Sequence, residues 1–116
     1  MVDKLIYIET EKGKYPMLFN LNVLEAIQEE YGSFTKWVEL IENTEEPNFK
    51  ALKFGLREAI NEGIDIENDS LGVKRPLLTG KQVGRILTEV GFNNAAGAIR
   101  QAVVSEAAEQ NAEIKN

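Results

Sequence analysis

Three acidic residues at alternate positions, Asp65, Glu67 and Asp69, form a segment whose spacing suggests a calcium site. Carboxylate oxygens are preferred Ca²⁺ ligands, and an EF-hand loop begins with this spacing. Counted from Asp65, such a loop needs glycine at its sixth position and a bidentate glutamate at its twelfth, where this chain has Ser70 and Pro76. We therefore expect a solvated acidic loop, with weak cation binding as the lesser alternative, and assign no metal ligand.

A second candidate is the pair of glycine-containing dipeptides Gly80-Lys81 and Gly84-Arg85, which stand where a helix is expected to begin. Helix N-termini that follow glycine-rich loops can bind phosphate. Neither the Walker spacing nor G-x-G-x-x-G is present, and no strand pattern precedes these glycines. Helix packing explains both glycines better, so we expect no cofactor.

Groups that commonly perform catalysis are scarce in this chain, which contains no histidine and no cysteine. These residues supply the commonest general base, the commonest transition-metal ligand and the best nucleophile. The remaining acids fall mostly on polar helix faces, where solvation is their ordinary role. We therefore expect no catalytic residue and a protein that is not an enzyme.

Composition and charge limit the classes of partner that this protein is expected to bind. The chain has 116 residues, of which 43% are hydrophobic, and 19 acidic residues against 13 basic ones give a formal net charge of −6. That charge repels phosphate backbones, so nucleic acid is not an expected partner. The N-terminus lacks a secretion signal and no apolar run reaches the roughly 20 residues of a membrane span, so we expect a cytoplasmic protein without a membrane partner.

A β-hairpin is predicted at the N-terminus, over about residues 4–19. Aromatic and β-branched residues on both sides of the segment Glu11-Lys-Gly-Lys14 are typical of two strands joined by a glycine-containing turn. Pro16 cannot donate a backbone hydrogen bond, which places the second strand at a sheet edge or places Pro16 at its start.

Helical periodicity begins after the hairpin. Asn22 is expected to cap a first helix that runs to about Tyr31, and Gly32 suits a left-handed position at its end. Ser33 is expected to cap a second helix. Tyr31, Phe34 and Trp37 could form an exposed binding anchor, but their helical spacing favours packing in the core.

A third helix is predicted after the turn at residues 44–47, and it continues until Gly63. Its one apolar face is formed by Phe49, Leu52, Leu56, Ala59 and Ile60. Gly55 within it costs about 1 kcal/mol relative to alanine, which suggests a close helix crossing. The segment Ile64–Leu78 contains acidic, asparagine, glycine and proline residues and is expected to be a long solvated loop.

The last two helices follow that loop. Thr79 and Gln82 form a capping-box pattern for the fourth helix, which Gly91 should end. Asn93 or Asn94 is expected to cap the fifth. The fold class is thus mainly α (α+β): an N-terminal β-hairpin followed by four to five short amphipathic helices in a compact bundle. We expect one globular domain over residues 1–105, with helices over about 22–105, and a frayed or disordered acidic tail over 106–116.

The order of these elements resembles the tail assembly chaperones of long-tailed phages and prophages over roughly residues 5–105. The resemblance lies in the hairpin and in three stretches that follow it: Leu18–Ser33, the spacer to Pro47 with the helix Phe49–Ile60, and Leu78–Leu87. It implies a non-enzymatic protein of the host cytoplasm that binds the tape measure protein, keeps it soluble and helps recruit tail tube subunits. It also implies absence from the finished virion and, in many relatives, a longer frameshifted form.

Two other functions fit the composition. One is a structural head-tail or tail component that stays in the phage particle. The other is an acidic regulator that binds a basic protein, although the acids here are spread over several helices and interleaved with lysines. Self-association into a homo-oligomer is also left open. The hairpin edge and the last two helices are the surfaces we expect to contact a partner, without individual residues assigned.

Overall fold

The N-terminal hairpin has the predicted form. β1 (Ile6–Thr10) pairs antiparallel with β2 (Gly13–Met17), with Thr10 opposite Gly13 at the turn. Pro16 lies inside β2, where a two-stranded sheet makes every strand an edge. The computed structural model describes residues 5–43 and 45–114, with side chains described as far as Val104. Lys4, the predicted first residue of the hairpin, and residues 115–116 of the predicted tail lie outside the described residues.

Two short helices follow, α1 (Leu21–Tyr31) and α2 (Phe34–Glu42). The predicted cap of α1 at Asn22 is wrong, because Asn20 is the N-cap and its side chain accepts from Val23 N. Asn20 stands two residues earlier because the helix begins immediately after the buried end of the hairpin. Ser33 caps α2 as predicted, and Gly32 between the helices has a positive φ of 88°.

The long helix α3 (Phe49–Leu71) is the centre of the fold and contacts β2, α1, α2, α4 and α5. It crosses Trp37 of α2 at Gly55, where an added Cβ would lie 2.1 Å from Cζ2 of the indole, so the close crossing is confirmed. The predicted end at Gly63 and the predicted loop over 64–71 are wrong. Gly63 is required by packing instead, because an added Cβ would lie 2.6 Å from the carbonyl oxygen of Pro16.

Two asparagines seven residues apart hold the irregular segment 72–79 along α3. The side-chain amide of Asn61 donates to Leu78 O at 3.1 Å and accepts from Leu78 N at 2.8 Å. Asn68 makes the same pair of bonds to Arg75 O and Arg75 N, at 2.9 and 3.0 Å. The predicted loop is therefore shorter than expected and bound to the helix that precedes it.

The last two helices are α4 (Gly80–Val90) and α5 (Phe92–Ile114). Thr79 and Gln82 form the predicted capping box, and Gly91 ends α4 as predicted. The predicted cap at Asn93 or Asn94 is wrong: α5 already begins at Phe92, and Ala95 N donates to Gly91 O. The helical backbone continues through Ile114, and fraying of the tail stays a prediction.

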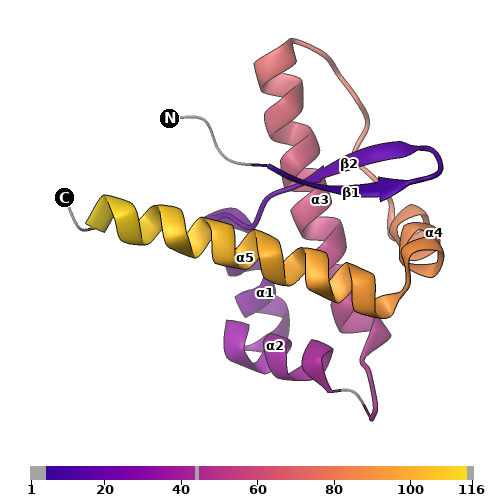
Figure 1. Cartoon of the computed structure of the whole chain (residues 1–116), viewed down its shortest axis with the longest axis vertical. Helices are drawn as coiled ribbons and strands as arrows, with labels where there is room; N and C mark the ends of the chain where they lie inside the picture. The colour runs from indigo at the N-terminus through magenta and orange to yellow at the C-terminus, as the bar shows by residue number, and fades with distance from the viewer. Residues whose placement is uncertain (1–4, 44, 115–116) are drawn as a thin grey trace.

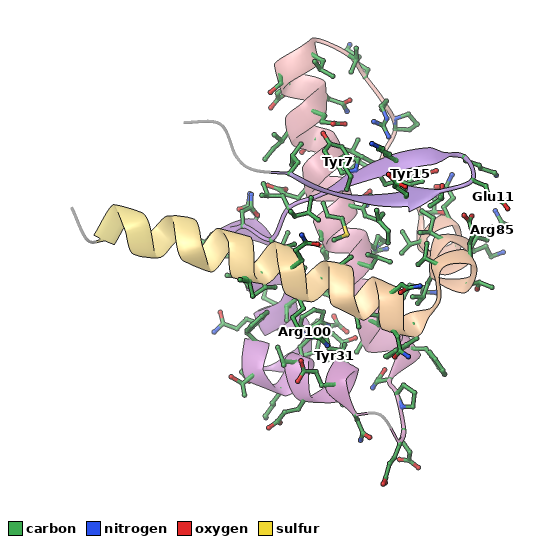
Figure 2. The ribbon with its side chains drawn as sticks, viewed as in Figure 1. Tyr7, Glu11, Tyr15, Tyr31, Arg85 and Arg100 are labelled. Carbon is green, nitrogen blue, oxygen red and sulfur yellow. The ribbon has the colours of Figure 1, made fainter. Side chains whose placement is uncertain are left out.

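The hairpin and five helices form a mainly α globule built around one core (Figure 1). The hairpin and α5 both lie across α3, α1 and α2 lie together, and α4 lies near the hairpin turn, where Glu11 and Arg85 are found (Figure 2). The largest fully buried side chains are Trp37, Phe19, Met17, Leu18, Ile27, Leu52, Leu56, Ile60, Ile64, Ile99, Val23 and Val83. No helix in the described part of the chain combines the length and apolar character that a membrane crossing requires.

Candidate functional site

Two lysines of α3, Lys50 and Lys53, stand between two hollows of the surface. Both lysines line a first hollow of about 510 Å³, between α3, α4 and the start of α5. Both also line a second hollow of about 140 Å³, between α3, the end of α1 and the start of α4. We call these two residues the Lys50–Lys53 ridge, because they separate the hollows and belong to each.

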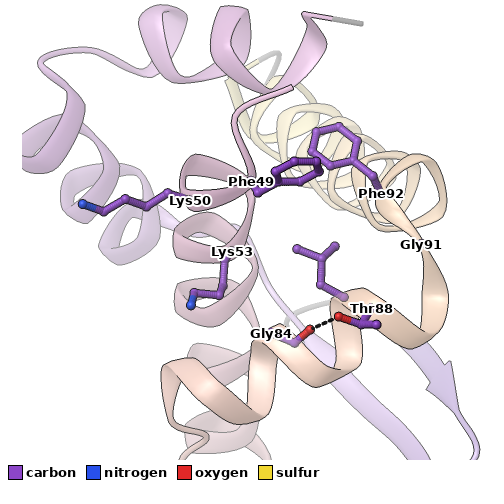
Figure 3. Close-up of a pocket in the computed structure, with 8 residues that line it drawn as sticks. Phe49, Lys50, Lys53, Gly84, Thr88, Gly91 and Phe92 are labelled. Carbon is purple, nitrogen blue, oxygen red and sulfur yellow. Dashed lines mark hydrogen bonds between the residues drawn. The ribbon is translucent and has the colours of Figure 1, made fainter. Parts of the chain in front are cut away.

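The first hollow has an aromatic pair at one end. The rings of Phe49 and Phe92 meet edge to face, with centroids 5.5 Å apart and planes at 85° (Figure 3). Phe49 is 62% exposed although it is a large apolar side chain, so its ring is open to a partner, whereas Phe92 is partly buried against the core. Leu87 adds further apolar surface to the lining of the same hollow.

The other side of the first hollow is formed by α4. Its Thr88 hydroxyl donates to Gly84 O at 2.9 Å, which turns the polar end of that side chain back onto its own helix (Figure 3). A Cβ added at Gly84 would lie 3.6 Å from Cδ of Lys53, so the lysine stem passes close to the α4 backbone. That distance is an ordinary van der Waals contact, and a Cβ at Gly80 would meet nothing within 4 Å. Packing therefore requires glycine at neither position, and the helix-packing explanation is wrong for both.

The second hollow contains another aromatic pair. Tyr31 and Phe54 meet edge to face with centroids 5.5 Å apart and planes at 75°. Burial, and secondarily the charge of Glu30, raise the pKa of Tyr31 above its ordinary value of 10.0. The Tyr31 hydroxyl therefore stays protonated and neutral at physiological pH, which leaves the ring with an apolar face and one polar end.

The charge around the ridge is opposite to that of the whole chain. Lys50, Lys53 and Arg57 line the hollows, against the single carboxylate of Glu30. Among the described residues neither lysine lies within 4.0 Å of a carboxylate, while Arg57 lies 3.6 Å from Glu58. A protein with a formal net charge of −6 thus has a local cationic surface between its two aromatic pairs.

A third feature is an apolar groove of about 220 Å³ between α2 and α5. Trp37 and Ile99 lie at its base, and Val104 on its edge is 62% exposed. Arg100 and Glu42 form an ion pair at its rim, with 3.4 Å between Nε and Oε1. The groove lies on the part of α5 that leads to the helix end seen projecting beyond the other elements (Figure 1).

The acidic residues considered for calcium do not gather into a site. They lie on α3, where alternate residues point to different sides of the helix. Glu67 instead accepts from the Tyr7 hydroxyl at 2.6 Å and pairs with Arg75 at 3.1 Å. Among the described residues, no group of three potential metal ligands is close enough to hold an ion.

The predicted aromatic core is confirmed at Trp37, which is fully buried and donates from Nε1 to Ala51 O at 2.8 Å. Tyr31 and Phe34 are partly buried against the core. Sequence reasoning missed the ridge. A signal was present, because Lys50, Lys53 and Arg57 recur at i, i+3 and i+7 on one helix face.

The arrangement is suited to binding rather than to holding a reacting group in an enclosed space. Both hollows are open, aromatic rings supply apolar contact area, and the lysines supply charge at the boundary between them. No protein-family model, curated protein or solved structure matches this chain.

Proposed function

We propose that this chain is a non-enzymatic tail assembly chaperone of a long-tailed phage or prophage. It binds the tape measure protein in the host cytoplasm, keeps this long helical client soluble and assists assembly of the tail tube. The proposal rests on the likeness of residues 5–105 to that family and on the surface just described.

The observation that carries the proposal is the exposed Phe49–Phe92 pair in the first hollow. Phe49 is 62% exposed and lines a hollow of about 510 Å³ together with Leu87 and Phe92, and a contiguous apolar patch of this kind is typical of a protein-binding surface. Helical clients bind such surfaces by placing one apolar face in a groove between helices. The hollow lies between α3 and α4 and reaches the start of α5, so a helix of the client can contact three elements at once.

The acidic net charge of the chain also fits a chaperone that must keep a complex soluble. A formal net charge of −6 opposes self-aggregation of a complex whose client is rich in apolar helix faces. The two hollows and the groove between α2 and α5 supply apolar contact area for such a client.

Co-expression with the tape measure protein of the same phage genome tests the proposal. We expect the client to co-purify with this chain and its soluble fraction to rise. Phe49→Ser should reduce both effects with little change in folding, because Phe49 is exposed. Leu71→Ser is the matched control, since Leu71 is 69% exposed at the far end of the same helix.

Absence of co-purification together with no gain in client solubility would refute the proposal. Equal loss of binding in Phe49→Ser and Leu71→Ser would show that the client does not contact the first hollow specifically. Mass spectrometry of purified particles separates the chaperone from a structural tail component, because only the latter remains in the virion in stoichiometric amounts.

A further inference from the structure

We infer that the Lys50–Lys53 ridge, with an aromatic pair on each side, selects an amphipathic helix whose apolar face is flanked by aspartate or glutamate residues. This inference rests on the proposed function and specifies which part of a client is bound. The occupant is a partner helix of stated charge rather than any apolar segment.

The symmetry of the surface about the ridge is the first support. Phe49–Phe92 lies in one hollow and Tyr31–Phe54 in the other, and both pairs have ring centroids 5.5 Å apart. Lys50 and Lys53 line both hollows. A helix laid across α3 therefore meets apolar rings at both ends of its contact and ammonium groups in the middle.

Charge complementarity is the second support. In the described part of the chain, neither ridge lysine has a carboxylate within 4.0 Å, so their charges are available to a ligand. Figure 3 shows the ammonium groups of both lysines directed away from the Phe49–Phe92 pair. Carboxylates on the flank of a bound helix would meet them without entering the apolar hollow.

The lysine stems explain why charge and apolar contact can be combined here. Cδ of Lys53 lies close to the α4 backbone at Gly84, so its methylene groups belong to the wall of the first hollow. Lysine commonly covers apolar surface with its stem while its ammonium group stays in water. Lys53 thus contributes apolar contact through its methylene groups and charge through its ammonium group.

Single-stranded nucleic acid also binds surfaces that combine aromatic rings and cations. Glu30 lies in the second hollow, and the whole chain is acidic. This acidity opposes a phosphate backbone, which carries one charge per nucleotide, more than it opposes a helix with a few flanking carboxylates. Nucleic acid becomes an outcome that the experiment can detect.

The test uses the full chain and two labelled synthetic helical peptides of about 20 residues. The peptides share one Leu and Phe face and differ only at the flanking positions, which are glutamate in one and lysine in the other. By fluorescence anisotropy we expect the glutamate peptide to bind at least about tenfold more tightly, with affinity that falls as salt rises. A labelled oligo(dT) strand serves as the nucleic-acid probe.

The variant Lys50→Glu with Lys53→Glu should abolish this preference and favour the lysine peptide. Lys36→Glu with Lys74→Glu is the matched control, because it changes the net charge equally at exposed lysines outside both hollows. Circular dichroism verifies folding, and Lys50→Gln with Lys53→Gln removes the charges without reversing them. This milder variant should bind both peptides alike.

Equal binding of the two peptides by the unmodified chain, equal effects of the ridge and control variants, or tighter binding of oligo(dT) would each overturn the inference. The proposed function is read out separately by co-purification of the tape measure protein. If the client co-purifies but the ridge variant retains it as well as the control does, the inference alone fails.

Discussion

Trp37 lies directly against Gly55, and an added Cβ at Gly55 would stand 2.1 Å from Cζ2 of the indole. The ring is fully buried and hydrogen-bonded to Ala51 O, so it cannot move aside freely. We expect Gly55→Ala to lower the free energy of unfolding by about 1–3 kcal/mol, despite the better helix propensity of alanine. Urea unfolding followed by fluorescence of Trp37, the single tryptophan, measures the loss.

Gly97→Ala is the control for that substitution. Gly97 is also within a helix, but an added Cβ there would meet nothing within 4 Å. Alanine should therefore raise stability by about 0.5–1 kcal/mol through propensity alone. Similar effects at both glycines would show that the contact between Trp37 and α3 does not restrict residue 55.

The N-cap of α1 gives a second prediction. Asn20 accepts from Val23 N and donates from Nδ2 to Glu62 at 2.6 Å, whereas Asn22 makes only the bond to Glu62, at 3.0 Å. Asn20→Ala should lower the free energy of unfolding by about 1 kcal/mol or more, and Asn22→Ala by less than about 0.5 kcal/mol. Asn20→Ser keeps a capping oxygen and should restore part of the loss, as chemical denaturation will show. The reverse order of the two alanine variants would identify Asn22 as the cap.

The segment 72–79 should detach from α3 when its asparagine contacts are removed. Asn68→Ala deletes both bonds to the backbone of Arg75, and Asn61→Ala deletes both bonds to the backbone of Leu78. We expect faster amide exchange at Arg75 in the first variant and at Leu78 in the second, measured by hydrogen–deuterium exchange. Asp69→Ala, at an exposed neighbouring position, is the control and should leave both amides unchanged.

Alkaline pH should destabilise the fold partly through Tyr7. Its hydrogen bond to Glu67, followed by burial and the negative charge of Glu67, raises the pKa of Tyr7 above 10.0, while Arg75 acts in the opposite direction. The folded state therefore holds this proton more tightly than the unfolded state. Its contribution is present below pH 10 and is lost as the pH rises through the folded-state pKa.

Tyr7→Phe removes this proton and should make the decline of stability above pH 10 less steep. Urea unfolding at a series of pH values compares the variant with the unmodified chain. Tyr31 has a pKa raised in the same direction, so part of the decline should remain in the variant. An unchanged slope would show that the bond between Tyr7 and Glu67 does not contribute to stability.

Most of the elements could be predicted from sequence because caps and apolar periodicity act locally. Ser33 and the pair Thr79 and Gln82 cap the helices they were expected to cap. The predicted helix end at Gly63 was wrong because glycine can either end a helix or allow another backbone to approach it closely. Here it admits the backbone of Pro16, a contact between residues distant in sequence, and α3 continues to Leu71.

The candidate site was harder to predict than the fold. Phe49 was expected on the apolar face of the third helix, yet it is 62% exposed and pairs with Phe92 from another helix. Lys50 and Lys53 are ordinary surface lysines until α1 and α5 bring the rings of Tyr31 and Phe92 to the two sides of them. A pattern within one helix indicates which residues share a face, but it does not indicate what lies opposite that face.

The central place of α3 has a consequence for the order in which the chain can fold during synthesis. Met17, Ile27 and Trp37 are fully buried, and the elements that contain them all contact α3, which ends at Leu71. A two-stranded hairpin and two short helices have little stability without a packing partner. The first third of the chain therefore cannot pack stably until the middle third has left the ribosome. Nascent chains arrested before α3 is complete should remain sensitive to protease.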